Sequence, residues 1–315
     1  MFLIVVVIAV VVVLDYLSTR VDKRPANPFA FSVDEYEAVD ESMIAYRETR
    51  QISAGEQPIL AMAYGNGRIF LLTDDYLQVI TPLGQEIGRT PVDPGGSCIA
   101  LAPDGIVLIG YANYLVALQG EAEIARSEVL DGEAFISAIT ASGDHVFAAD
   151  AGNRRVSVFN PELEHLHSFQ GESGVSSLHG LILPSRHFDL KLNDENELWV
   201  VNPGLHTIQN YTQGGRLRGH WGKASFDADG FSGCCNPYFI AFLSDGRFAT
   251  SEKGIIRIKI HKESGEFDTY VAAPEKFRDG SRAPALAVNE QDHIFALDFD
   301  RNMIRYFEPK TEPAH

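Results

Sequence analysis

Six short segments with one shared pattern follow each other along this 315-residue chain. Each begins with an apolar run, turns on Gly, Asp or Asn, and enters a second run, as in "CIALAPDGIVLIG" at residues 98–110. Apolar runs of this length are typical of strands that are buried on both faces. The turn residues lie 38 to 53 residues apart, at Gly67, Gly105, Gly143, Asn196, Gly246 and Asp292.

Further strands follow each of these pairs. A third strand of alternating character continues every unit, as in "YLQVITP" at residues 76–82, and a fourth strand follows in the first five units. Four strands in a unit of about 40 to 50 residues predict the blade of a β-propeller. A β-sandwich is the alternative, but its strands would not recur in sets of four at this spacing. The predicted fold is therefore all-β, a six-bladed β-propeller.

The sixth unit lacks a fourth strand of its own, because the chain ends soon after residue 308. A spare strand, "IAYRETRQIS" at residues 44–53, stands before the first unit. Because unpaired strand edges are a liability, we expect residues 44–53 to pair with residues 302–307 and close the ring. The propeller then spans residues 44–310, and a short tail follows at residues 311–315.

The first 17 residues, "MFLIVVVIAVVVVLDYL", are almost entirely apolar. At about 1.5 Å per residue they reach roughly 25 Å, close to the lower limit for crossing a bilayer. A cleavable signal peptide is the alternative, but the segment has no basic start and no small-x-small cleavage site. We therefore predict a transmembrane anchor at residues 1–19, with residues 1–17 in the lipid bilayer. Residues 20–43, which carry prolines and acids, are expected to form a linker.

The charged residues indicate which partners are possible and on which side of the membrane the propeller lies. The chain has 43 acidic and 26 basic residues and a net charge of −17, so no nucleic-acid partner is expected. Arg20, Lys23 and Arg24 follow the apolar run, and this position favours a cytoplasmic location for that side. Against this, large folded domains cross membranes despite such weak signals. We expect a single-pass protein whose acidic propeller is extracytoplasmic.

One unit carries a recognisable motif. "VFAADAGNRRVSVFN" at residues 146–160 resembles an NHL repeat, with Asp150, Gly152, Asn153 and Arg155 in its characteristic turn. Residues 198–222 and 294–309 are similar to more diverged copies. The whole chain resembles bacterial membrane-anchored NHL proteins that carry a GCCNP segment, and this resemblance implies a six-bladed propeller.

The residue types of this turn suggest structural roles. Asp150 and Asn153 can bond to nearby backbone groups and tolerate left-handed φ, and Gly152 adopts such a φ without penalty. Arg155 is expected to brace a carboxylate or carbonyl group of an adjacent strand. The motif therefore predicts that these residues stabilise the fold and take no part in a reaction.

Two of the three cysteines, Cys234 and Cys235, are adjacent in "GKASFDADGFSGCCNP" at residues 222–237, the longest connection between units. Three roles stay open for them. They can pack as small apolar residues, carry redox chemistry, or bind a transition metal such as zinc, copper or iron. For the metal site, His187 and His179 are the best additional ligands. A disulfide between adjacent cysteines is disfavoured, since it needs a strained eight-membered ring.

Three functions are compatible with these features. We favour a non-catalytic interaction or scaffold module, an accessory subunit that binds a membrane protein or complex. A metal-dependent enzyme is the second, since six-bladed lyases and lactonases resemble this arrangement, and a redox accessory subunit using the cysteine pair is the third. No motif assigns a catalytic residue. The predicted entrances to the inner strands offer few metal ligands: Pro58, Ser97, Phe135, His187, Tyr238 and Pro284.

Overall fold

The computed structural model describes residues 10–12, 15, 34–53, 55–171, 180–277 and 282–310. Contacts divide the chain into two compact units, Met1–Glu35 and Tyr36–His315. The predicted anchor at residues 1–19 lies almost wholly outside the described residues, and the tail at residues 311–315 lies entirely outside them. None of the helices in the described ranges combines the length and apolar character that a membrane crossing requires.

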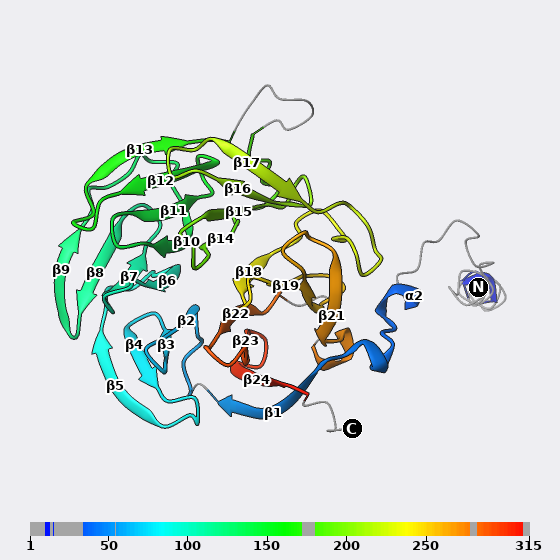
Figure 1. The fold of residues 1–315 in the computed structure, drawn as a ribbon. Coiled ribbons are helices and arrows are strands. Elements are labelled where there is room, and N and C mark those ends of the chain that lie inside the picture. Colours follow the sequence, from blue (N-terminus) through cyan, green and yellow to red (C-terminus); the bar gives the residue numbers. More distant parts are fainter. Residues whose placement is uncertain are drawn as a thin grey trace, which may run out of the picture. The chain divides into compact units, whose positions relative to one another are not determined.

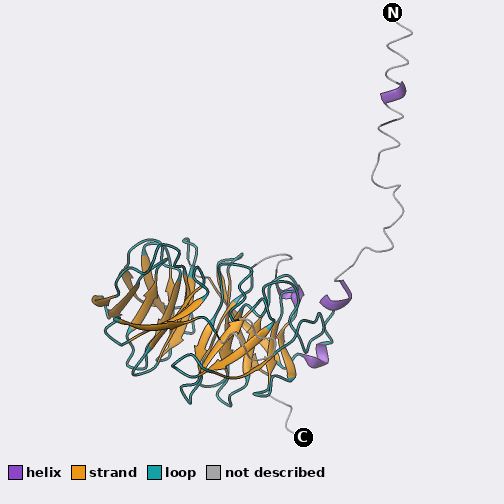
Figure 2. Ribbon diagram, turned by 90° about the horizontal axis from the view of Figure 1, so that it is seen from above, coloured by secondary structure: helices purple, strands orange, loops and turns teal. Residues whose placement is uncertain are grey.

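The second unit is a six-bladed β-propeller, as predicted. Its six sheets, each of four antiparallel strands, are arranged around a central axis (Figure 1). Strands and loops make up nearly all of the described propeller (Figure 2). The exceptions are three short helical turns: α2 (Asp34–Glu37), η2 (Glu41–Met43) and η3 (Pro274–Lys276).

The blades follow each other along the chain. Within each blade the first strand given lies nearest the central axis, and the following strands lie progressively further from it (Figure 1). Blades one and two contain β2 (Ala61–Gly65), β3 (Arg68–Leu72), β4 (Tyr76–Ile80), β5 (Glu86–Pro91), β6 (Cys98–Leu101), β7 (Val107–Gly110), β8 (Leu115–Gln119) and β9 (Ala122–Arg126). Blades three and four contain β10 (Ile136–Ala141), β11 (Val146–Asp150), β12 (Arg155–Phe159), β13 (His165–Phe169), β14 (Leu190–Leu192), β15 (Leu198–Asn202), β16 (Thr207–Tyr211) and β17 (Leu217–Trp221). Blades five and six contain β18 (Phe239–Phe242), β19 (Phe248–Ser251), β20 (Ile258–His261), β21 (Phe267–Ala272), β22 (Ala285–Val288), β23 (Ile294–Asp298), β24 (Met303–Pro309) and, as the outermost strand, β1 (Tyr46–Ser53).

The ring closes through β1, which pairs antiparallel with β24 in the sixth blade. The register places Ile52 opposite Ile304 and Tyr46 opposite Pro309, with a bulge between Glu48 and Arg50. The predicted closure by the strand upstream of the first blade is therefore confirmed. It joins the N-terminal end of the propeller to its last blade.

The hydrophobic core is divided into six clusters, and each cluster lies between two neighbouring blades. Alternate side chains of a strand point to opposite faces of its sheet, so a middle strand packs against both of the neighbouring blades. On β3, Ile69 and Leu71 pack with Phe295 of the sixth blade, whereas Leu72 packs with Ile109 of the second. Middle strands such as β3 and β7 are therefore apolar along most of their length.

Two segments differ from the sequence-based expectation. "IIRIKIH" at residues 255–261 is strand only from Ile258, because the amide of Glu252 bonds to the carbonyl of Arg257 across a tight turn. Part of the expected linker packs on the propeller. The ring centroid of Tyr36 lies 5.2 Å from that of Phe226. At residue 45 the backbone amide of Ala45 donates to the carbonyl oxygen of Tyr270 in the fifth blade.

Candidate functional site

The turn between β11 and β12 holds the NHL-like residues. Asp150 is fully buried and accepts hydrogen bonds from the backbone amides of Phe135 (3.0 Å) and Asn153 (3.2 Å). It also accepts hydrogen bonds from the Asn153 side chain (2.8 Å) and from Arg155 Nε (2.9 Å). Arg155 pairs in addition with Asp131 at 2.7 Å. These contacts tie the start of the inner strand to the hairpin of the same blade, which is a structural role.

Gly152 contributes in another way than expected. Its backbone is not left-handed, and the residue in this turn with positive φ is Arg154, at +53°. A Cβ atom at Gly152 would lie 1.7 Å from the carbonyl oxygen of Glu133. Glycine is therefore required for the close approach of two backbones, and the expectation of a left-handed Gly152 is wrong. The motif's spacing does not reveal which residue of the turn takes the positive φ.

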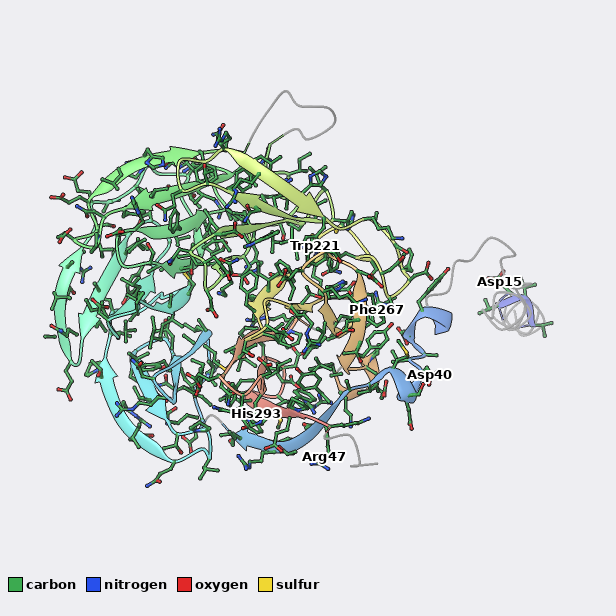
Figure 3. All side chains as sticks on the ribbon, in the orientation of Figure 1. Asp15, Asp40, Arg47, Trp221, Phe267 and His293 are labelled. Carbon is green, nitrogen blue, oxygen red and sulfur yellow. The ribbon has the colours of Figure 1, made fainter. Side chains whose placement is uncertain are left out.

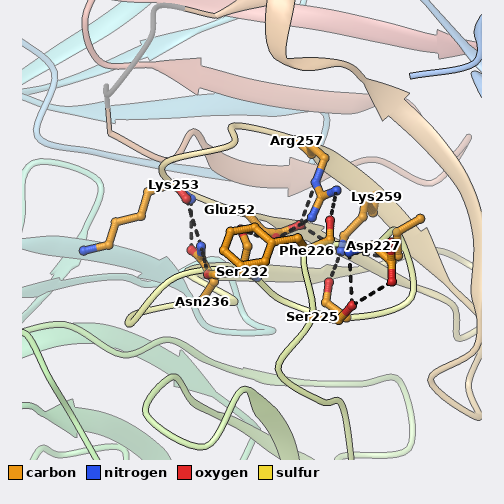
Figure 4. A network of polar contacts seen from close by, with 11 residues as sticks. Ser225, Phe226, Asp227, Ser232, Asn236, Glu252, Lys253, Arg257 and Lys259 are labelled. Carbon is orange, nitrogen blue, oxygen red and sulfur yellow. Dashed lines mark hydrogen bonds and ion pairs between the residues drawn. The ribbon is translucent and has the colours of Figure 1, made fainter. Parts of the chain in front are cut away.

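Three buried charged side chains lie beneath the connection at residues 222–237 (Figure 4). Glu252, Arg257 and Lys259 of the fifth blade are each no more than 1% exposed. Lys259 Nζ lies 2.8 Å and Arg257 Nη2 3.2 Å from Glu252 Oε1. Burial lowers the pKa of Lys259 to about 8, although the Glu252 carboxylate opposes this shift. Burial raises the pKa of Glu252, but Lys259 and Arg257 outweigh it and hold that pKa below its usual range.

These charges bind the connection through its backbone. Lys259 donates to the carbonyl oxygens of Ala228 (3.0 Å) and Gly230 (2.6 Å), and Arg257 donates to that of Phe226 (2.9 Å). Glu252 accepts a hydrogen bond from the amide of Ser232 at 3.1 Å. We call residues 222–237 the clamped segment. Sequence reasoning missed this cluster, whose alternating pattern is typical of a solvent-exposed strand face.

The N-terminal end of the clamped segment is also well packed. Trp221, the last residue of β17, packs against residues of the fifth blade (Figure 3). Its ring centroid is 5.0 Å from that of His261 and 4.9 Å from that of Phe248. Aromatic pairs at such separations stabilise a core beyond the area that they bury. The residue that precedes the clamped segment is therefore held in place by aromatic packing.

Cys234 and Cys235 are both free thiols, and their Sγ atoms lie 3.3 Å apart. Cys235 is 3% exposed, whereas Cys234 is open to solvent. The next residue, Asn236, fixes the turn: its side chain donates to the carbonyl oxygens of Ser232 (2.7 Å) and Lys253 (2.8 Å) and accepts from the Lys253 amide (2.9 Å). The sulfur pair therefore sits on a rigid turn with one sulfur accessible.

The two thiols differ in acidity. Burial raises the pKa of Cys235, but interactions with Cys234, Ser185 and Lys253 outweigh it and set this pKa below its ordinary value. The hydrogen bond to Cys235 raises the pKa of Cys234. Cys235 is therefore the sulfur that ionises first, and once it is a thiolate Cys234 is the donor of the hydrogen bond between them. The third cysteine, Cys98, is buried in β6, and burial raises its pKa to about 12.

The central channel opens into a cavity of about 260 Å³ at the end where the inner strands begin. Four of the predicted entrance residues line it: Ser97, Phe135, His187 and Tyr238. The ring of His187 stacks on that of Tyr238 with centroids 4.0 Å apart, and its Nε2 donates to the Tyr238 carbonyl at 3.1 Å. Burial lowers the pKa of His187 to about 4, so this histidine is neutral at pH 7.

The structure brings only part of the predicted metal site together. His179 lies outside the described residues. In the part of the chain that the structure describes, no three His, Cys, Asp or Glu side chains gather in a way that could hold a metal ion. There His187 belongs to the channel mouth rather than to a ligand cluster with Cys234 and Cys235. A transition metal at the cysteine pair stays a prediction.

Comparison with known proteins supports the fold. No protein-family model matches the sequence, and no curated protein matches it. Virginiamycin B lyase from Staphylococcus aureus is 14% identical, with a TM-score of 0.55 over 85% of this chain and 90% of its own. Hydrazine synthase from Kuenenia stuttgartiensis is 13% identical, with a TM-score of 0.56 over 82% of this chain and 97% of its own. The WD40 propeller domain of Doa1 is 11% identical, with a TM-score of 0.56 over 84% and 98%. At these identities the likeness shows that the chain has the β-propeller fold, and it shows no function.

Proposed function

We propose that this chain is a membrane-anchored, NHL-type β-propeller that acts as a non-catalytic interaction module, an accessory subunit of a membrane complex. The main support for this function is that the clamped segment is held in one backbone arrangement by buried charges. A long surface connection ordinarily loses conformational entropy when a partner binds it. Here Glu252, Arg257 and Lys259 hold its backbone in one arrangement beforehand. A preorganised surface of this kind favours the binding of a protein partner.

Membrane attachment is supported by the apolar run at residues 1–17. Its length is close to the minimum for a bilayer span, and only Asp15 interrupts its apolar character. The propeller is then tethered close to the bilayer, which restricts its search for partners to the membrane surface. We place the propeller on the extracytoplasmic side.

Site-specific photo-crosslinking in cells tests this function. A photoreactive amino acid at Lys223, an exposed position in the clamped segment, is expected to give a discrete crosslinked species in the membrane fraction. The same group at the exposed Glu121, in the turn between β8 and β9, is the matched control and is expected to give none. Identical species from both positions, or none from Lys223, would argue against the proposed surface. Deleting residues 1–19 should release the protein from carbonate-washed membranes.

A redox accessory role is the second candidate, favoured by the 3.3 Å sulfur pair. A disulfide between these adjacent residues closes a strained eight-membered ring, and such strain makes the bond easy to reduce again. With hydrogen peroxide as oxidant, the Cys235 thiolate attacks one oxygen, the O–O bond breaks, and a sulfenic acid forms as hydroxide leaves and takes up a proton to become water. The Cys234 thiol then attacks that sulfur, the S–O bond breaks, water leaves and a disulfide forms. The two thiols lose two electrons, and the peroxide is reduced to two waters.

Intact-protein mass spectrometry after hydrogen peroxide treatment checks this step. We expect the native protein to lose two hydrogen atoms and gain no oxygen, with peptide mapping placing the bond between Cys234 and Cys235. The Cys98→Ser variant is expected to behave in the same way, because Cys98 is buried and weakly acidic. The Cys234→Ser variant is expected to stop at a trappable sulfenic acid. Free thiols at both positions, or stepwise gain of oxygen in the native protein, would refute the redox role.

A further inference from the structure

The mouth of the central channel has an unusual charge for this protein. All six inner strands or the residues just before them contribute to its lining. Among the described residues, the cationic side chains of the lining are Arg186, Lys191 and Arg282, and its one carboxylate is Asp189. His187 is neutral at pH 7, because burial lowers its pKa to about 4. The described lining of the mouth therefore has an excess of two positive charges in a chain whose net charge is −17.

The single carboxylate is already used by the scaffold. Asp189 is 1% exposed, and its two oxygens accept hydrogen bonds from the backbone amides of Leu190 and Ile240, both at 2.9 Å. Lys191 approaches the same carboxylate at 3.4 Å, while its side chain stays 31% exposed. Asp189 thus joins the fourth and fifth blades, and it does not neutralise the two arginines.

The arginines are held by aromatic rings rather than by acids. Arg186 lies 5.6 Å from the ring centroid of Phe135, and Arg282 lies 3.9 Å from that of Phe299. Within the described ranges, neither guanidinium has a carboxylate at ion-pair distance. Both residues are exposed at the cavity mouth. Stacking on a ring orients a guanidinium and leaves its N–H groups available for an incoming anion.

Most of the remaining lining residues are apolar, although Ser97, Ser137 and His187 also line the cavity. Phe135, Tyr238, Phe239 and Phe299 contribute rings, and aliphatic side chains such as Met62 complete the wall. A volume of about 260 Å³ lies just below the usual range for small-molecule pockets, about 300–1,000 Å³, so the cavity fits a small ligand. A cationic rim above an aromatic wall matches a small molecule with an acidic group at one end and a planar apolar body.

We propose that the channel mouth binds a small aromatic or similarly planar organic anion, with Arg186, Lys191 and Arg282 holding its acidic group. The apolar body lies against Phe135 and the rings beside it. This site goes beyond the interaction role of the clamped segment, and neither depends on the other. It is a binding site, and no reaction is assigned to it.

Isothermal titration calorimetry of the full-length protein in non-ionic detergent tests the site. The probes are 2-naphthoate and its neutral analogue 2-naphthalenemethanol. We expect one naphthoate per chain, weaker binding as salt rises, and at least tenfold weaker binding of the alcohol. The double variant Arg186→Gln, Arg282→Gln is expected to lose at least tenfold in naphthoate affinity. Arg68→Gln, Arg216→Gln removes the same charge from exposed positions outside the cavity and is expected to bind naphthoate unchanged.

Several outcomes would overturn the site. They are no heat with millimolar naphthoate, equal binding of the neutral analogue, or equal losses in the two double variants. A hexaglutamate peptide that binds as tightly as naphthoate would also overturn it, in favour of an acidic protein segment as the occupant. Unfolding midpoints of both double variants, measured alongside, are expected to match the parent, because neither pair of arginines makes an ion pair within the described residues.

Discussion

Deleting residues 1–53 is expected to abolish the monomeric, cooperatively folded propeller, because it removes β1 from the sixth blade. Tyr46 and Ile52 of β1 are 5% and 7% exposed. Burial of such side chains contributes about 1.5–3 kcal/mol each, and backbone hydrogen bonds to β24 add about 0.5–1.5 kcal/mol apiece. Their sum approaches the whole stability of a typical domain, about 5–15 kcal/mol. The deletion also leaves β24 as an unpaired edge that is open to aggregation.

Size-exclusion chromatography and thermal unfolding followed by circular dichroism measure this effect. The matched control is a chain of residues 36–315, which keeps β1 and is expected to elute as a monomer with a single transition. In the full-length protein, Ile52→Ala should cost about 2 kcal/mol of unfolding free energy, at the low end for core truncations because β1 is an outer strand. A cooperative monomer from residues 54–315 would contradict the closing role of β1.

The propeller could be predicted from the sequence because its blades leave local signatures. A middle strand such as β11 (Val146–Asp150) is buried at every position, so its sequence is a short apolar run without alternation. The turn before β3 reads Asn66-Gly67, and both residues have positive φ, as the tightest hairpin turns require. The closing strand was predictable for a different reason. Counting strands left one unpaired edge in the last blade and one spare strand before the first.

The candidate sites were harder to predict because their parts come from separate segments. Arg257 and Lys259 alternate with isoleucines, and this pattern is typical of a strand with one face in water. That face is covered by the clamped segment, which belongs to the preceding connection, and no local pattern indicates this. Arg186 and Arg282 meet at one cavity although they are far apart in the sequence. Only the closed ring brings such residues together.

Glu252→Gln is expected to cost about 3–5 kcal/mol of unfolding free energy, because it leaves Arg257 and Lys259 buried without their carboxylate. The substitution keeps the size of the side chain, so the loss reports charge rather than packing. Urea denaturation followed by tryptophan fluorescence measures it, since Trp221 lies in the same region. The matched control is Glu86→Gln, which breaks an exposed ion pair with Arg89 and is expected to change stability by no more than about 0.5 kcal/mol.

The pH dependence of this loss identifies its cause. The pKa of Lys259 is lowered to about 8, below the value of the unfolded chain, so the contribution of Lys259 to the stability of the parent protein rises with pH above about 8. Without Glu252 this pKa falls further, and folded Lys259 gives up its proton at lower pH. The difference between parent and Glu252→Gln should therefore be largest near pH 6 and smaller at pH 9. Adding Lys259→Met to Glu252→Gln removes one of the two uncompensated charges and is expected to recover part of the loss. A pH-independent difference, or no recovery in the double variant, would show that Lys259 does not contribute to the loss and that the uncompensated charge of Arg257 accounts for it.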